Sequence, residues 1–327
     1  MVKKFLFFLI VLLLVVNVLG TQNPFQGTKD ETYYMVTFLS GISFWKACFS
    51  GFEAAADMLG VTAVYTGHPT FDINGEVTVF NQVAAKNPAG IAVTAVNPDA
   101  FVKPINEAVN NGIPVVTFDS DSPSSKRYSF IGVGNKNAGA AAAHFVAEVL
   151  NGKGEVALLY SIGQGNVEQR VQGFLETIES SYPDIKVVAK VNDGGDQLTA
   201  TKNMSATLQA HPEIDMIFCV DGVAGVGGAQ AVKETNNVGK VKILAFDVDP
   251  AVISYVKSGI IEGTVVQGMS AMGFWSMMTL YLLHHNLVPE AYIPSFIDSG
   301  VIIATKENID EILDSQGLTP MGLPKKK

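Results

Sequence analysis

Two carboxylates stand at matching places in this sequence, each directly after an apolar run. Phe118-Asp119 follows the run over 113–117, and Phe246-Asp247 follows the run over 241–245. Pro123 and Pro250 come shortly afterwards, so we expect prolines to stop both strands and to leave the acids at the carboxyl edge of a sheet. Ligands bind at that edge in open α/β sheets. The repeated pattern predicts two similar lobes that face one small polar molecule.

Paired carboxylates suit several kinds of chemistry. Asp119 and Asp247 could flank a glycosidic bond, and the two Asp-x-Asp pairs could hold a cation or cap turns and helices. Nothing in the sequence marks one acid as held protonated for acid catalysis. The sequence also lacks the dinucleotide fingerprint, the phosphate loop, the nucleophile elbow and the zinc-protease motif. We therefore expect a binding protein with no catalytic residues, no bound metal and no cofactor.

The polar residues at predicted sheet edges match a sugar or another polyol in type. Carboxylates accept hydrogen bonds from hydroxyls, amides both donate and accept, arginine donates as a fork, and an aromatic ring covers an apolar C–H face. The candidate ligand-binding residues are Phe44, Trp45, Asp119, Asn135, Arg170, Asp221, Asp247 and Gln267. Structural alternatives remain open: core packing for Trp45, a surface ion pair for Arg170, and turn, cap or crossover roles for the three polar residues Asn135, Asp221 and Gln267.

Short apolar runs alternate with helical stretches along the whole chain. Strands are predicted over 33–39, 61–66, 91–95 and 114–118, and again over 156–160, 186–191, 216–220, 242–245 and 264–266. Helices are predicted over 45–59, 73–86, 101–110, 167–180, 197–210, 226–234 and 251–258. Continuous apolar strands separated by helices predict parallel sheets covered on both faces. The fold class is therefore α/β with two doubly wound parallel-sheet lobes, and the helix over 272–284 is expected to cross back to the first lobe.

The ends and the composition limit the possible partners. Lys3 and Lys4 precede an apolar run over 5–16, which is the layout of a secretory signal peptide over 1–20, with an uncleaved membrane anchor as the alternative. The formal net charge is −9, and removal of the two lysines lowers it by two to −11. An acidic chain without clustered Lys and Arg argues against nucleic-acid binding.

The cysteines and histidines give no metal-binding spacing. Cys48 and Cys219 fall in different predicted lobes, so we expect both to be buried, unpaired, small apolar residues. The pair His284-His285 has no Cys or carboxylate near it in the sequence. We expect these two histidines to lie on the surface and to bind no metal.

Several motifs together resemble one known family. The run Gly112 to Pro123 is similar to the "GIPVVTxD" signature of periplasmic sugar-binding proteins of ABC importers, the type that binds ribose, galactose or glucose. Further matches are Phe130 to Asn135, Arg170 to Phe174, Phe218 to Asp221, Ala245 to Asp247 and Val265 to Gln267. The resemblance implies that the polar candidates contact a sugar in a cleft and that Trp45 stacks on it. Ser120 replaces a common Arg and Asp221 a common Asn, which puts ribose itself in doubt.

The expected organisation is a signal peptide over 1–20, an N-terminal lobe over 31–134 plus 268–298, a C-terminal lobe over 135–267 plus 299–318, and a tail over 319–327. The chain would be periplasmic or otherwise extracytoplasmic, bind a monosaccharide or cyclitol by hinge closure, and deliver it to the membrane permease of an ABC importer. A sensor that feeds a chemoreceptor or another signalling partner is the alternative, followed by a cleft glycoside hydrolase.

Overall fold

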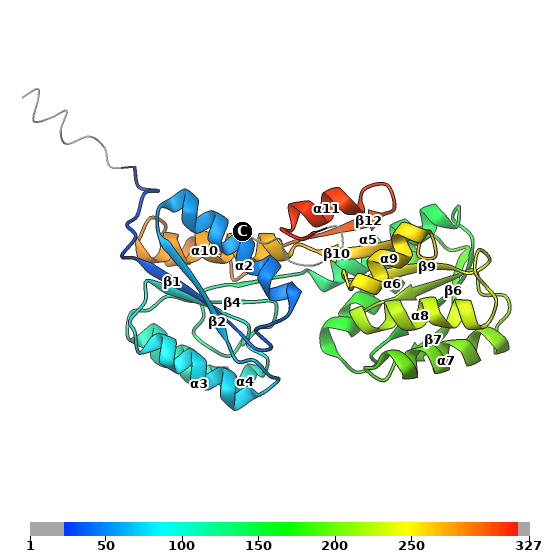
Figure 1. Cartoon of the computed structure of the whole chain (residues 1–327), viewed down its shortest axis with the longest axis horizontal. Helices are drawn as coiled ribbons and strands as arrows, with labels where there is room; N and C mark the ends of the chain where they lie inside the picture. Colours follow the sequence, from blue (N-terminus) through cyan, green and yellow to red (C-terminus); the bar gives the residue numbers. More distant parts are fainter. Residues whose placement is uncertain (1–22, 320–327) are drawn as a thin grey trace, which may run out of the picture.

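The computed structural model describes residues 23–319, which form two six-stranded sheets with helices on both faces (Figure 1). We call the first of these sheet A, and its strand order is β11-β5-β4-β3-β1-β2. Every neighbouring pair of strands in sheet A is parallel. Its strands are β1 (Thr32–Thr37), β2 (Thr62–Gly67), β3 (Gly90–Val93), β4 (Val115–Phe118), β5 (Phe130–Gly132) and β11 (Phe296–Asp298).

The second sheet, sheet B, has the order β12-β10-β9-β8-β6-β7. Only its edge strand β12 runs antiparallel, against β10. Its strands are β6 (Gly154–Tyr160), β7 (Ile185–Asn192), β8 (Met216–Cys219), β9 (Lys242–Phe246), β10 (Gly263–Gln267) and β12 (Val301–Thr305). The predicted fold class, two doubly wound parallel-sheet lobes, is confirmed.

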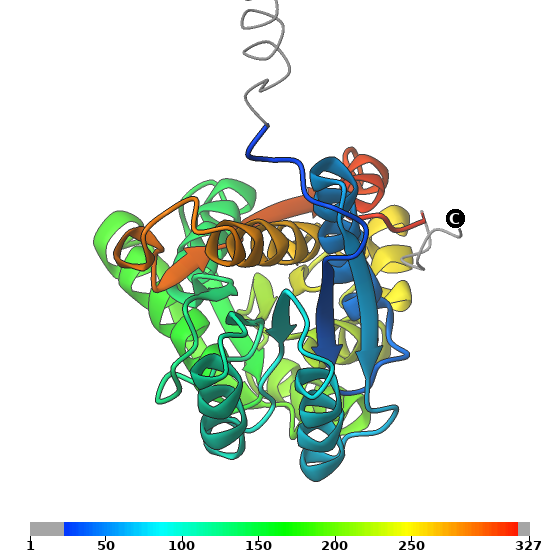
Figure 2. The same cartoon turned by 90° about the vertical axis from the view of Figure 1, so that its left-hand side faces the viewer.

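Helices cover both faces of sheet A. Its helices are α2 (Ser43–Leu59), α3 (Ile73–Ala84), α4 (Pro98–Asn110) and α10 (Met269–His284). α2 and α10 pack together on one face, and α3 and α4 pack together on the other (Figures 1 and 2). Successive side chains of a strand point to opposite faces. On β1, Met35 joins the core under α2 and α10, whereas Val36 joins the core under α3 and α4. The expected return of the late helix to the first sheet is confirmed by α10.

Sheet B and its helices form the second half of the protein, and they follow the same plan. α5 packs against α6, and α7 packs against α8. α9 contacts α8 and β10, and Lys257 of α9 forms an ion pair of 2.6 Å with Asp310 of α11. These helices are α5 (Asn135–Val149), α6 (Gly165–Ser181), α7 (Gln197–Ala210), α8 (Gly222–Glu234), α9 (Pro250–Ser258) and α11 (Ile309–Ser315), and a short 3-10 helix η1 (Glu290–Tyr292) precedes β11.

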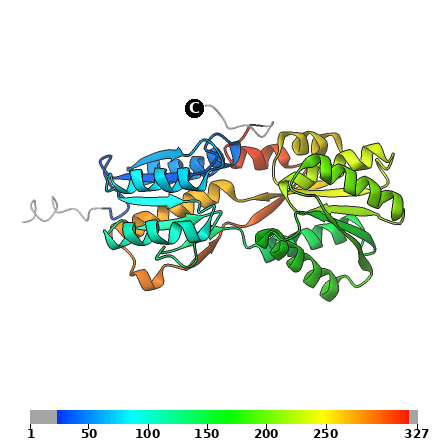
Figure 3. The same cartoon turned by 90° about the horizontal axis from the view of Figure 1, so that it is seen from below.

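The chain passes three times between the two sheets, after β5, after β10 and after β11 (Figure 3). Backbone hydrogen bonds join these crossings: Ser299 N–H donates to the carbonyl of Gly132 (2.8 Å), and Gly268 N–H donates to that of Gly300 (3.0 Å). Gly300 has φ +72°, a left-handed conformation that favours glycine. The three crossings therefore form one hydrogen-bonded connection.

Three strands, β5, β11 and β12, were not predicted from the sequence. β5 and β11 have only three residues each, too few to show a pattern. β12 is a short apolar run at the sheet edge, where Ile302 is exposed, and it was not predicted as a strand. The cysteine prediction is confirmed, because Cys48 and Cys219 are both free and buried.

Candidate functional site

Asp119 and Asp247 occupy equivalent positions at the carboxyl ends of β4 and β9. Each has a left-handed backbone, with φ 60° for Asp119 and 67° for Asp247. Each backbone N–H donates to the next strand of its sheet, to Ile131 (3.0 Å) and to Val265 (2.9 Å) respectively. The left-handed residue turns the chain out of the strand. The strands therefore end before the acids, and the prediction that the following prolines stop them was wrong.

The Asp119 carboxyl is held in a buried environment. Ser120 Oγ donates to its Oδ2 at 3.0 Å. Burial raises the pKa of Asp119 to about 6, the Ser120 hydrogen bond and the positive charge of Arg170 oppose that rise, and the negative charge of Asp247 adds to it. Asp119 follows a strand of sheet A, whereas Asp247 and Arg170 belong to the second half. The two halves thus bring their charged groups into one electrostatic cluster.

Arg170 of α6 lies at the centre of this cluster and is only 5% exposed. Its Nε donates to Asn135 Oδ1 (2.9 Å), and its Nη1 donates to the carbonyl of Val220 (3.2 Å). Its guanidinium lies 3.9 Å from the centre of the Phe246 ring. Burial lowers the pKa of Arg170, and the negative charges of Asp247, Asp119 and Asp221 oppose this fall. The surface ion pair considered from the sequence is not formed, because Arg170 is turned into the protein.

Asp247 and Gln267 contact each other directly. Gln267 Nε2 donates to Asp247 Oδ1 at 2.7 Å, and Thr264 Oγ1 donates to the Asp247 carbonyl at 2.6 Å. Burial raises the pKa of Asp247, Arg170 and Gln267 oppose that rise, and Asp221 adds to it. Gln267 ends β10 and immediately precedes a crossing between the sheets. A residue that contacts Asp247 therefore also lies at the connection between the halves.

Asp221 is already engaged by the backbone. Its Oδ1 accepts from the N–H groups of Val223 (3.1 Å) and Ala224 (3.0 Å), which caps α8. Its Oδ2 accepts from Ser161 N–H at 2.9 Å. Asp221 is 8% exposed, so its remaining capacity to accept hydrogen bonds is small. Its role as a ligand contact stays a prediction.

The two aromatic candidates differ in exposure. Trp45 is 3% exposed and packs edge-on against Phe38, Phe44 and Phe118, with ring centres 4.8 to 5.9 Å apart. Its Nε1 has no hydrogen-bond partner among the described residues. Phe44 is half-buried and lies in the first turn of α2. Trp45 thus belongs to the core, Phe44 has the more accessible ring, and stacking of either ring on a ligand stays a prediction.

The sequence missed two residues beside this cluster. Phe246 forms the aromatic face on which Arg170 lies. Asp193 is buried, accepts from Ser161 Oγ at 2.7 Å, and has an Oδ2 atom without a hydrogen-bond partner in residues 23–319. It directly follows β7, as Asp119 and Asp247 follow their strands, but β7 alternates apolar residues with Lys and Asn, so the pattern of an acid after a continuous apolar run is absent there. Asp249 caps α9, as expected, whereas Asp121 forms an ion pair of 2.6 Å with Arg127.

The facing carboxyl ends and the shared Arg–Asp cluster define a class, the type I periplasmic binding proteins. A family model described as a periplasmic binding protein domain matches residues 33–285, more than half of the chain. The chain therefore belongs to the periplasmic binding protein family. The resemblance seen in the sequence is confirmed.

Relatives and solved structures agree with this assignment. The arabinose binding protein AraP of Geobacillus stearothermophilus is 43% identical, with 86% of this chain and 98% of that chain covered and a TM-score of 0.83. The xylose/arabinose-binding protein XylF of Sulfolobus acidocaldarius is 28% identical over 80% of this chain and 68% of its own. A structure of an XylFII-LytSN complex is 26% identical, with 86% and 99% of the chains covered and a TM-score of 0.74. The first two relatives are named as binding proteins, not as enzymes.

The predicted signal peptide over 1–20 lies outside the described residues. Within 23–319, no helix has both the length and the apolar character needed to cross a membrane.

Proposed function

We propose that this protein is an extracytoplasmic binding protein that captures a monosaccharide or cyclitol and delivers it to an ABC importer. One observation carries the proposal: Arg170, almost fully buried, is shared electrostatically by Asp119 from one sheet and Asp247 from the other. A ligand held there would be contacted by both halves. The names of the arabinose-binding and xylose/arabinose-binding relatives support a sugar of pentose or hexose size.

The side chains offer a polyol complementary hydrogen bonds. The carboxylates of Asp119 and Asp247 accept from hydroxyl groups, the Asn135 amide donates, and the Arg170 guanidinium donates from nitrogen positions not used by its protein contacts. Phe44 covers an apolar C–H face of the ring. Because two carboxylates face a single guanidinium, a neutral polyhydroxylated ring fits better than an acid.

Capture proceeds by closure of the two lobes about the three crossings. The lobes of the proposal are residues 31–134 plus 268–298 and residues 135–267 plus 299–318. The distribution of the strands between sheets A and B supports this division. Closure removes water, so each polar group that a wrong stereoisomer leaves unpaired costs about 1–3 kcal/mol.

Calorimetric titration tests the proposal. The panel contains arabinose, xylose, ribose, allose, galactose, glucose and myo-inositol, with arabinose first because of the 43% identical relative. We expect one or a few of these ligands to bind at micromolar or tighter Kd. Absence of any ligand better than millimolar would contradict the proposal.

Two variants test the site itself. Asp119→Ala and Asp247→Ala should each weaken binding roughly 10- to 100-fold, since a hydrogen bond to a charged group contributes about 1.5–3 kcal/mol. Asp249→Asn is the matched control, because this cap lies two residues from Asp247 and asparagine also caps helices. Circular dichroism checks that every variant is folded. Unchanged affinity in both alanine variants would show that the sugar binds elsewhere on the protein.

A sensor role is the second candidate, and the XylFII-LytSN complex supports it. Deletion of the gene separates the two roles. Loss of labelled sugar uptake indicates import, whereas normal uptake with a lost transcriptional or chemotactic response to the sugar indicates sensing.

A further inference from the structure

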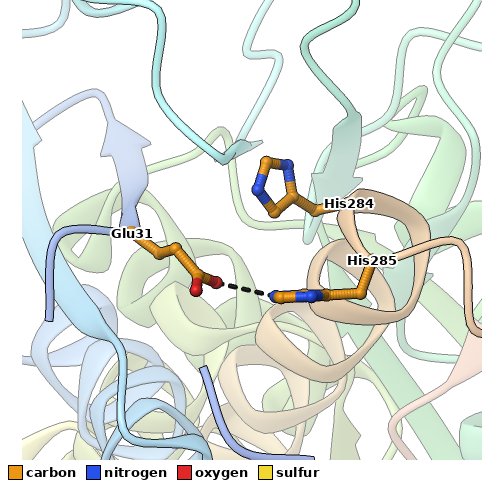
Figure 4. Close-up of side chains that lie close together, drawn as sticks. All are labelled: Glu31, His284 and His285. Atoms are coloured by element: carbon orange, nitrogen blue, oxygen red, sulfur yellow. Dashed lines mark hydrogen bonds and ion pairs between the residues drawn. The ribbon is translucent and has the colours of Figure 1, made fainter. Parts of the chain in front are cut away.

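Three side chains with metal-binding atoms meet at the amino end of sheet A (Figure 4). Glu31 directly precedes β1, His284 ends α10, and His285 is the next residue. One ligand atom from each, an imidazole nitrogen or a carboxylate oxygen, lies within 4.8 Å of the others. His285 Nε2 and Glu31 Oε2 are 2.7 Å apart. The sequence near this histidine pair has no carboxylate, but the fold supplies one from 254 positions away.

The carboxylate is fixed in place by the segment that precedes it. Glu31 Oε1 accepts from Thr28 N–H (2.9 Å) and lies 3.3 Å from Thr28 Oγ1. This arrangement leaves Oε2 directed at the histidines, as Figure 4 shows. Hydrogen bonds that orient the ligating groups are a regular feature of metal sites.

The imidazole rings are also held by neighbours. The His285 ring lies 4.2 Å from the Tyr281 ring, and the Tyr281 hydroxyl donates to the Pro24 carbonyl at 3.0 Å. The His284 ring meets the Tyr33 ring edge-on at 6.0 Å. The rings therefore need little reordering to bind an ion.

There is room beside these residues for an ion with its water ligands. Glu31 and His284 line a surface pocket of about 360 Å³, together with the acidic Asp30. Lys86 is also on this pocket, but its ammonium lies 5.1 Å from the centre of the Tyr34 ring. The pocket is separate from the Asp119 cluster, because the two lie at opposite ends of the parallel strands of sheet A.

We propose that Glu31, His284 and His285 bind a divalent transition metal of the zinc type, with water completing the coordination. Two imidazole nitrogens and one carboxylate oxygen form a common ligand set for zinc. Metal bonds of about 2.0–2.2 Å require only small side-chain movements from the present spacing. The ion would fasten the segment over 23–31 to the end of α10.

The competing explanation is a plain hydrogen bond or ion pair between His285 and Glu31. His284 distinguishes the two, because the metal needs it and the pair does not. His211 provides a matched control, since it makes an exposed contact of 2.8 Å with Glu213. Among the described residues, no second histidine joins that pair to form a metal-binding cluster.

The experiment uses the full exported chain without a polyhistidine tag. Zinc chloride is titrated calorimetrically into wild type, His284→Ala and His211→Ala, after treatment with a chelator. We expect one zinc per wild-type chain with a micromolar Kd, a Kd weakened at least 10-fold in His284→Ala, and no change in His211→Ala. The Tm of the wild type should rise by roughly 5 °C at 100-fold excess over Kd.

Two further measurements make the result decisive. Cobalt substitution should give the strong visible bands of a low-coordinate nitrogen and oxygen site in wild type and His211→Ala, but not in His284→Ala. Sugar affinity should be the same in wild type and His284→Ala. A protein that binds sugar but no zinc would contradict the metal site alone, and one that binds zinc but no sugar would contradict the sugar proposal alone. No zinc binding, or equal zinc affinity in wild type and His284→Ala, would overturn the metal site.

Discussion

At the scale of single residues, burial changes the pKa of several acidic side chains. Asp119, Asp247 and Asp193 all follow strands, and burial raises the pKa of all three. Arg170 limits the rise at the first two acids, because its positive charge favours the ionised carboxylate. Arg170 therefore favours the ionised form of the two acids that lie nearest to it.

Glu76 of α3 is a buried acid outside this cluster. It is 0% exposed, and neither of its carboxyl oxygens has a hydrogen-bond partner among residues 23–319. Burial raises its pKa from 4.5 to about 8. The folded state thus keeps a proton that the unfolded state loses above pH 4.5.

Glu76→Gln should change how stability depends on pH. The wild type should lose stability as pH rises between about 4.5 and about 8, by up to about 1.4 kcal/mol per pH unit, because only the folded state holds the extra proton. Glutamine carries no proton to lose. Urea unfolding should give similar stabilities near pH 5 and a more stable variant at pH 9.

The control for this prediction is Glu107→Gln on the neighbouring helix α4. Its side chain is 61% exposed, so its replacement should leave the pH dependence close to that of the wild type. A pH profile of Glu76→Gln that runs parallel to the wild type would show that Glu76 ionises normally.

At the scale of elements, the same helix crossing occurs once on each sheet. Gly51 of α2 faces the backbone of Ser270 on α10, and Gly273 of α10 faces that of Cys48 on α2. In the second half, Gly139 of α5 faces the backbone of Arg170 on α6 in the same way. A Cβ atom at any of these glycines would overlap a backbone carbonyl. Glycine therefore sets how closely each helix pair packs.

Gly139→Ala should affect both stability and ligand binding. The added methyl group would displace the Arg170 backbone, and overpacking of this kind costs about 1–3 kcal/mol. Thermal unfolding should show a lower Tm, and calorimetry should show weaker sugar binding, because Arg170 moves away from the acids. Gly165→Ala on α6 is the control, since nothing lies within 4 Å of a Cβ there. Because alanine favours a helix more than glycine does, Gly165→Ala should keep or raise the Tm. An unchanged or raised Tm in Gly139→Ala as well would show that the crossing tolerates the methyl group.

At the scale of the whole molecule, one carboxylate joins two of the three crossings. Asp298 Oδ1 accepts from Gly134 N–H and from Gly300 N–H, both at 2.9 Å. Its Oδ2 accepts from Asn137 Nδ2 at 3.1 Å. The crossing after β5 and the crossing after β11 are therefore held by the same side chain, which limits how the two halves move.

Asp298→Ala should loosen this connection. The free protein would sample more arrangements of its halves, so closure on a sugar would cost more conformational entropy and Kd should rise about 3- to 10-fold. Calorimetry measures the affinity, and X-ray scattering should show a broader free state. Asp298→Asn keeps an acceptor for both glycine N–H groups and should behave nearly as wild type. Unchanged affinity in Asp298→Ala would show that the backbone bonds alone define the hinge.

Local patterns were enough to predict the fold class and the position of the twin acids. Continuous apolar strands separated by helices specify covered parallel sheets, and an acid after such a strand must lie at its carboxyl end. β5 and β11 escaped prediction because three residues are too few to show a pattern, and β12 is a short strand at the sheet edge. The ligand contacts of the eight candidate residues remain predictions.

Only the tertiary structure decided which side chains meet. It turned Arg170 onto Phe246 and Asn135, placed Trp45 in the core, and brought Glu31 to His285. Sequence periodicity reports which face of an element is apolar, but it carries no information about which distant element will cover that face. The position of the acids at the strand ends therefore follows from the local sequence. Their ionisation and the cluster of Glu31 with the two histidines depend on distant segments that the fold brings together.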